Sequence, residues 1–259
     1  MLPLPHAEVH LWLFALDAAA DTVAALTAYL APDEAARAGR FRHTDDVRRY
    51  RVARGALRVL VGGYLMQSPG SLHFEYGAHG KPGLAAGSSD VDLQFNLSHS
   101  GELALAAFCV GHPVGVDLEC ADRKVDALAL AGRYGSPREQ AMLQALDPAA
   151  RSRRFIELWT CKEAWLKASG LGVTAGLAGL DIDFSGARPH IAQLPQQEQG
   201  DVRDWSVALF EPAVNHVASV ALRDPQHEFS GIVQRQQAVP DRALAAKHFT
   251  LALNGRNPR

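Results

Sequence analysis

The chain has 259 residues, 47% of them hydrophobic and 21% charged, and its formal net charge is -2. That length allows one large domain or two small ones with separate cores. The small net charge gives no field that would draw the chain to nucleic acid or a membrane surface, and no stretch approaches the roughly 18 uninterrupted apolar residues of a membrane span. The three cysteines lack metal-ligand spacing and are typical of reduced thiols. We therefore expect a cytoplasmic protein that binds neither nucleic acid nor membrane.

The first part of the chain alternates strand and helix patterns. Its apolar start lacks the basic leader of a signal peptide and is typical of a strand. Hydrophobic periodicity and turn residues predict the following elements in order: a strand over 8–17, a helix entered through 31–41, a helix over 45–65, a turn-rich segment over 73–84, and strands over 93–100 and 103–110.

The second part repeats this pattern after a turn at residues 111–113. We expect a buried strand over 114–119 and a helix capped by Ser136, with Pro137 at its first position and Glu139 at its third. A long helix over 153–170 and a hairpin of strands over 205–210 and 216–223 complete the list.

The two parts share a long helix, a turn-rich stretch and a late apolar strand. The sequence therefore predicts an α+β (α/β) fold of two similar halves, residues 1–112 and 113–225, with an extension of unknown role over 226–259. The polar segment "QRQQAVPDR" in that extension has the composition of an exposed connector. We expect a chain that ends near Gln226 to keep its activity.

The segment "GVDLE" places two carboxylates in an apolar stretch. Successive side chains of a strand alternate between faces, so Asp117 and Glu119 point one way while Val116 and Leu118 point into a core. One interpretation is a strand end that emerges into water. The other is a pair of oxygen donors for a cation, because two neighbouring carboxylates without a partner repel each other and raise a pKa.

The segment "WTCKEAWLK" has helical spacing. Trp159, Glu163 and Lys167 stand at i, i+4 and i+8 and share one face. A surface Glu–Lys pair, worth about 0.3–0.5 kcal/mol, is the simplest explanation. A large aromatic on the same polar stripe, with Lys162 beside it, favours instead a site for a charged organic ligand.

The segment "FNLSHS" contains an adjacent Ser98–His99 pair. Neighbours on a strand face opposite ways, so His99 cannot act as base for Ser98, and no G-x-S-x-G turn surrounds the serine. Phosphate or hydroxyl binding is the better use, with a polar strand end as the alternative.

Arginines recur along the second predicted helix and the segment before it: Arg37, Arg40, Arg42, Arg48, Arg49, Arg51, Arg54 and Arg58. Solvated helix faces often explain such runs, yet guanidinium groups also suit phosphate oxygens, and Lys81 offers another cation. Three carboxylates without His or Cys form a hard, all-oxygen set suited to Mg²⁺. Together these features predict phosphoryl-type transfer from a polyphosphate donor.

The ordered segments "RFRHTDDVRRYRVARGALR", "GKPGL", "FNLSHS", "GVDLE" and "WTCKEAWLKASGLGV" closely resemble the Sfp-type 4'-phosphopantetheinyl transferases, over residues 30–180 and weakly to 222. The resemblance implies two similar α/β halves related by pseudo-twofold symmetry. It also implies transfer of the phosphopantetheine arm of coenzyme A to a serine of an apo acyl or peptidyl carrier protein. Adenosine 3',5'-bisphosphate is the other product, and we expect a monomer.

The resemblance assigns roles to single residues. Asp117, Glu119 and Glu163 would hold Mg²⁺, with Mn²⁺ as an alternative, against the diphosphate. Lys167 would neutralise the diphosphate with support from Lys162, and Glu163 or a metal-bound water would deprotonate the carrier serine. Positions that match the family's coenzyme A contacts are Arg37, Arg49, Lys81, Ser98, His99, Lys162 and Lys167. Two alternatives stay open here: a non-catalytic coenzyme A or carrier-protein binding module, and a Ser–His hydrolase.

Overall fold

The computed structural model describes residues 2, 4, 5, 8–172, 176–227, 231–236 and 247–251. The helices are α1 (Ala20–Thr27), α2 (Pro32–Ala38), α3 (Thr44–Leu65), α4 (Ala127–Tyr134), α5 (Pro137–Ala145) and α6 (Pro148–Ser169), with short 3₁₀ turns η1 (Pro69–Ser71), η3 (Leu177–Gly179) and η4 (Val202–Asp204). The strands are β1 (Glu8–Ala15), β2 (Phe74–Tyr76), β3 (Pro82–Leu84), β4 (Leu93–Ser100), β5 (Leu103–Val110), β6 (Val114–Cys120), β7 (Asp181–Asp183), β8 (His190–Gln193), β9 (Trp205–Ala213), β10 (His216–Arg223), β11 (Gly231–Gln236) and β12 (Lys247–Leu251).

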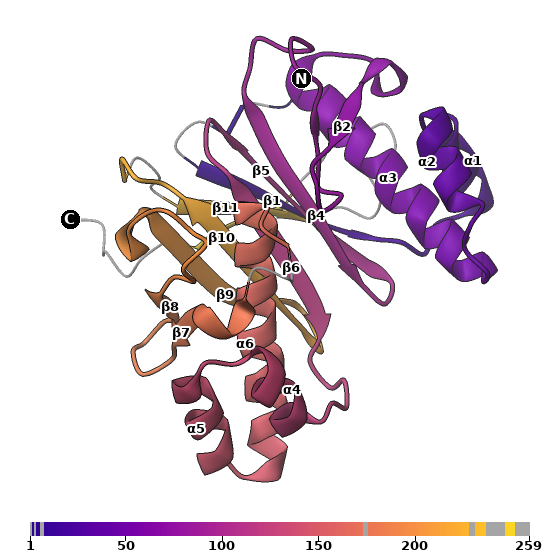
Figure 1. Cartoon of the computed structure of the whole chain (residues 1–259). Coiled ribbons are helices and arrows are strands. Elements are labelled where there is room, and N and C mark those ends of the chain that lie inside the picture. Colours follow the sequence, from indigo (N-terminus) through magenta and orange to yellow (C-terminus); the bar gives the residue numbers. More distant parts are fainter. Residues whose placement is uncertain are drawn as a thin grey trace.

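Two sheets form the centre of the molecule (Figure 1). The larger has the strand order β12-β11-β1-β5-β4 and the smaller β6-β10-β9. Apolar side chains of α3 cover one face of the larger sheet, and those of α6 cover one face of the smaller. The remaining faces pack on each other through a third apolar cluster that includes Leu11, Leu105, Val116 and Val220. This mixed arrangement is the expected α+β class.

The long helices begin and end at recognisable residues. Asp147 caps α6 by accepting from the backbone N–H groups of Ala149 and Ala150, with Pro148 in the first position, so α6 starts earlier than the apolar pattern predicted. It ends at Gly170, whose positive φ of 73° favours glycine. α3 ends at Leu65 as predicted, and a Cβ on Gly62 would lie 2.6 Å from the carbonyl oxygen of Gln67 as the chain turns back.

The two long helices are both 22 residues in length, and each binds a buried glutamate from a short helix before it. Glu34 is the third residue of α2, follows Pro32, and pairs with Arg58 of α3. Glu139 is the third residue of α5 and pairs with Lys162 of α6. The capping box predicted at Ser136 is confirmed. A buried pair between a glutamate and a cation of the following long helix is thus found on each side of residues 111–113.

The interpretation of the polar tail as irregular is wrong for residues 231–236, and residues 237–242 of the expected connector lie outside the described residues. Residues 231–236 form β11, which pairs in parallel with β1. Ile232 is fully buried in the apolar cluster between the sheets. The cause is non-local, because β11 borrows its pairing partner from the other end of the chain. Within the described ranges, every helix is too short or too polar to cross a membrane.

Candidate active site

Strand β6 carries the first two predicted carboxylates on the face that α6 covers. Asp117 and Glu119 share that face with Gly115, while Val116 and Leu118 enter the core between the sheets, as the alternation predicted. A Cβ on Gly115 would overlap the carbonyl oxygen of Ala164. Only glycine therefore lets α6 lie directly on β6, and that close approach brings Glu163 and Lys167 beside the two carboxylates.

These groups line a cavity of about 530 Å³ between β4, β6, α4 and α6. It contains six of the predicted residues: Ser98, His99, Asp117, Glu119, Glu163 and Lys167. Its remaining wall is mainly apolar and aromatic and includes Leu130, Tyr134, Phe155 and Trp159. Tyr134 meets the ring of Trp159 edge-on at 5.3 Å, which explains the aromatic residue on the polar stripe of the helix.

Asp117 is the centre of the polar contacts. Lys167 Nζ lies 2.6 Å from Asp117 Oδ1, and Ser98 Oγ donates to the same oxygen at 2.9 Å. The other oxygen, Oδ2, is buried and has no hydrogen-bond partner in the described structure. A buried carboxylate oxygen without a partner is costly unless a ligand or ion satisfies it.

The other two carboxylates are held in an unfavourable charge state. Burial raises the pKa of Glu119, and the charge of Asp117 raises it further, against the opposing Arg123 at 3.4 Å. Burial also raises the pKa of Glu163, where Lys167 opposes the change and Asp117 and Glu119 add to it. Sequence reasoning missed Arg123, which reaches Glu119 only because the chain turns directly after β6. A cation among these carboxylates would relieve their repulsion.

Lys162 does not lie in this cavity. Its Nζ stands 2.6 Å from Glu139 and donates to the carbonyl oxygens of Tyr134, Leu177 and Leu180. The side chain is only 1% exposed. Its predicted support of the diphosphate is therefore not what this geometry offers. Neighbouring helical positions point about 100° apart, so Glu163 faces the cavity while Lys162 points towards Glu139 of α5.

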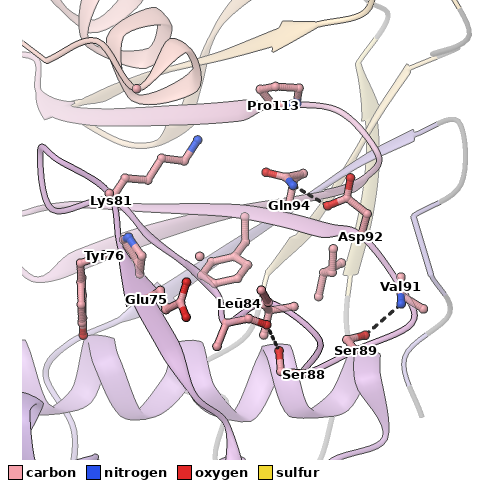
Figure 2. A pocket seen from close by; sticks show the side chains of 18 of the residues that line it. Glu75, Tyr76, Lys81, Leu84, Ser88, Ser89, Val91, Asp92, Gln94 and Pro113 are labelled. Atoms are coloured by element: carbon pink, nitrogen blue, oxygen red, sulfur yellow. Dashed lines mark hydrogen bonds between the residues drawn. The ribbon is translucent and has the colours of Figure 1, made fainter.

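Lys81 belongs to a second, larger cavity of about 740 Å³, beside the hairpin of β2 and β3. Figure 2 shows it there with Glu75 and Asp92. Its Nζ donates to the carbonyl oxygens of Val114 at 2.9 Å and Ala168 at 3.5 Å, and burial lowers its pKa to about 8. The larger cavity contains none of the predicted carboxylates, so the smaller one is the better candidate for chemistry.

The predicted arginines lie outside the lining of the smaller cavity. Arg37 is exposed and stacks on the ring of Tyr50, 5.9 Å from its centre. Arg49 pairs with Glu102 at 2.6 Å. It is nevertheless close enough to influence His99, whose pKa is lowered first by desolvation at the cavity wall and then by the cations of Lys167 and Arg49.

Comparison with known proteins gives consistent matches. Residues 17–110 match the family described as "4'-phosphopantetheinyl transferase, N-terminal", and residues 113–221 match the "4'-phosphopantetheinyl transferase superfamily". The 4'-phosphopantetheinyl transferase HetI of Nostoc sp. is 39% identical over 215 residues, which cover 83% of this chain and 87% of that protein. Sfp of Bacillus subtilis is 28% identical over 155 residues, 60% of this chain and 66% of that protein. Among solved structures, Thermotoga maritima holo-acyl-carrier-protein synthase has 17% identity and a TM-score of 0.36, over 47% of this chain and 66% of that one.

A cavity lined by carboxylates and a lysine has the charges that suit a phosphate-bearing ligand and its counter-ion. The chain belongs to the 4'-phosphopantetheinyl transferase superfamily. Membership implies coenzyme A as the donor of the arm and a carrier protein as its acceptor, and the matches favour an enzyme over a non-catalytic binding module.

Proposed function

We propose that the smaller cavity is the catalytic centre in which the phosphopantetheine arm of coenzyme A passes to a serine of an apo acyl or peptidyl carrier protein. The observation that carries this proposal is the convergence of Asp117, Glu119, Glu163 and Lys167 on one cavity. Carboxylates and a lysine from two elements suit a diphosphate and its counter-ion, since phosphoryl-type transfer depends mainly on positioning and charge neutralisation.

The donor set fits a divalent metal of the Mg²⁺ class. The three carboxylates offer only oxygen, the ligand type that Mg²⁺ and Mn²⁺ prefer. Asp117 Oδ2 is buried without a partner, and burial, followed by like charges, raises the pKa of both glutamates. As the side chains stand, no group of three His, Cys, Asp or Glu residues among those described is placed to hold a metal. Asp117, Glu119 and Glu163 would hold the ion, which would neutralise the diphosphate when bound.

The proposed reaction exchanges one phosphorus–oxygen bond for another, and the chain assists it with a base and with cations. The serine oxygen forms a bond to the phosphorus next to the pantetheine arm, and the bond from that phosphorus to the bridging oxygen breaks. Adenosine 3',5'-bisphosphate leaves with the electron pair. Glu163 takes the serine proton as general base. Lys167 would neutralise the leaving phosphate, and His99 and Arg49 would bind further phosphate of coenzyme A.

We also propose that the chain consists of two halves and that the cavity lies where they meet. Strands β5 and β6 belong to different sheets although only residues 111–113 separate them, and each half has its own buried glutamate–cation pair. These features support halves over 1–112 and 113–225. A working monomer is part of the same proposal, because one chain carries both halves. The three free cysteines support a reducing, cytoplasmic setting.

The test is to incubate the protein with coenzyme A, Mg²⁺ and an apo carrier protein and to weigh the carrier by mass spectrometry. A gain of one phosphopantetheine arm, lost with EDTA and with Asp117→Ala, is the expected result. Asp92→Ala is a matched control, because Asp92 lies in the larger cavity. Coenzyme A that binds without transfer to acyl or peptidyl carriers would contradict the proposal. Full activity in EDTA would contradict the metal assignment alone.

A further inference from the structure

The two sheets meet where β4 and β6 run side by side, and side chains make the contact. The sheet ladders pair β4 with β5 and β6 with β10, which leaves one edge of β6 facing β4. Along that edge the backbone N–H of Val116 donates to Asn96 Oδ1 at 2.9 Å. The N–H of Leu118 donates to Ser98 Oγ at 3.3 Å, and the N–H of Cys120 donates to Ser100 Oγ at 3.1 Å.

These three bonds follow the period of both strands. On β4, every second side chain points to the same face, and on β6, every second N–H points to the same edge. The three acceptors on β4 and the three donors on β6 therefore have the same two-residue spacing, so that each donor lies beside one acceptor. Asn96 is 4% exposed and Ser98 is 7% exposed, so a donor or acceptor left alone here would have little access to water. We call these residues, Asn96, Ser98 and Ser100, the side-chain ladder.

The middle of the ladder also touches the catalytic groups. A hydroxyl has one donor and two acceptor positions. Ser98 Oγ donates to Asp117 Oδ1 and accepts from Lys167 Nζ at 3.0 Å and from the Leu118 N–H. All three positions are used within the protein. Ser98 therefore has no free position for coenzyme A in this arrangement, in contrast to the role that the resemblance implied.

We propose that the side-chain ladder is a positioning device: it fixes the height and tilt of β6 against β4, and so sets where Asp117 and Glu119 stand relative to Glu163 and Lys167. This inference rests on the proposed function and adds Asn96 and Ser100, which do not line the catalytic cavity, to the residues that govern turnover. It also explains why "FNLSHS" places a polar residue at every second position of a largely buried strand.

Ser100 offers the sharpest test, because it is only partly buried and contacts no proposed catalytic side chain. Ser100→Val and Ser100→Thr have the same shape and branching, but only threonine keeps the acceptor oxygen. We expect Ser100→Val to lower kcat on the order of tenfold with little change in the KM for coenzyme A, since small misplacements of reacting groups reduce turnover strongly. Ser100→Thr should retain most of the kcat of the wild type.

A second measurement detects the loss of a ladder hydrogen bond independently of catalysis. Amide hydrogen exchange at Cys120, measured by NMR, should become faster in Ser100→Val than in Ser100→Thr because the N–H loses its acceptor. Asn96→Leu against Asn96→Asp repeats the comparison at Val116. Gln94→Leu is the control, because Gln94 lies on the same strand but bonds to Asp92 outside the ladder.

The outcomes separate the two proposals. Faster amide exchange at Cys120 in Ser100→Val with an unchanged kcat would overturn the positioning role. An unchanged rate of amide exchange at Cys120 in that variant would overturn it as well. A raised KM with a normal kcat would also overturn it, because Ser100 would then serve coenzyme A binding. If the wild type transfers no arm, the proposed function fails. The ladder would then stand as a structural contact through the exchange result, without a role in turnover.

Discussion

Replacing Lys162 with methionine tests whether this lysine supports the fold or binds coenzyme A. Its ammonium donates to three backbone carbonyl groups and pairs with Glu139, and both side chains are 1% exposed. Lys162→Met keeps an unbranched side chain only one atom shorter but leaves the Glu139 carboxylate buried without a counter-charge. Removing one partner of a buried ion pair costs about 3–5 kcal/mol. We therefore expect the free energy of unfolding to fall by that amount, against a typical total of about 5–15 kcal/mol.

The assay is urea unfolding followed by circular dichroism, with coenzyme A binding measured by calorimetry in buffer where the variant is still folded. We expect near-normal binding. The double variant Lys162→Met/Glu139→Gln should regain part of the loss, because a neutral buried amide that keeps one partner costs about 1–3 kcal/mol. Lys124→Met, at an exposed lysine, is the control and should stay within about 0.5 kcal/mol of the wild type. Unchanged stability combined with much weaker coenzyme A binding would refute the reasoning.

Three further results are expected. Glu163→Gln should lose most turnover yet raise the melting temperature at neutral pH without metal, because burial and like charges raise the pKa of Glu163. The gain in melting temperature should fade as the pH falls through that raised pKa towards the ordinary 4.5. An unchanged melting temperature at neutral pH would contradict the raised pKa. Lys167→Met should raise the pKa of His99, measured by NMR titration, because a nearby cation is lost; an unchanged value would place the two apart. A chain ending at Gln226 should lose at least about 1.5–3 kcal/mol of stability with buried Ile232, whereas an unchanged urea midpoint would restore the connector interpretation.

Elements with strong local signals were predictable from the sequence. The strand over 103–110 has the predicted bounds, and the Ser136 cap lies where the pattern placed it. Elements that depend on distant partners were not. Strand β11 has only six residues, and its sequence gives no sign of the pairing with β1 at the other end of the chain. Helix α4 was missed because its eight residues are too few to show a clear period.

The candidate site divides in the same way. Periods of two and of four residues were enough to place Asp117 with Glu119 and Glu163 with Lys167, because β6 and α6 are regular. The direction of Lys162 was not predictable from its own helix, since it depends on where α5 and η3 pack. Glu139, the partner of Lys162, was recognised only as part of a helix capping box, and nothing in the sequence showed that its carboxylate is buried. The role of Asn96 was not predictable, because it depends on the contact of β4 with β6, which belong to different sheets.

The position of the cavity between two separately covered sheets has a consequence for refolding. Each long helix can collapse onto its own sheet and form most of the secondary structure before the sheets meet, because the apolar clusters around α3 and α6 are distinct. The carboxylates of β6 reach Ser98 only when the faces around Val116 and Leu105 have closed on each other. Recovery of turnover after dilution from denaturant should then lag behind recovery of the far-ultraviolet signal. Enzyme activity would thus report the last docking event in the maturation of this chain.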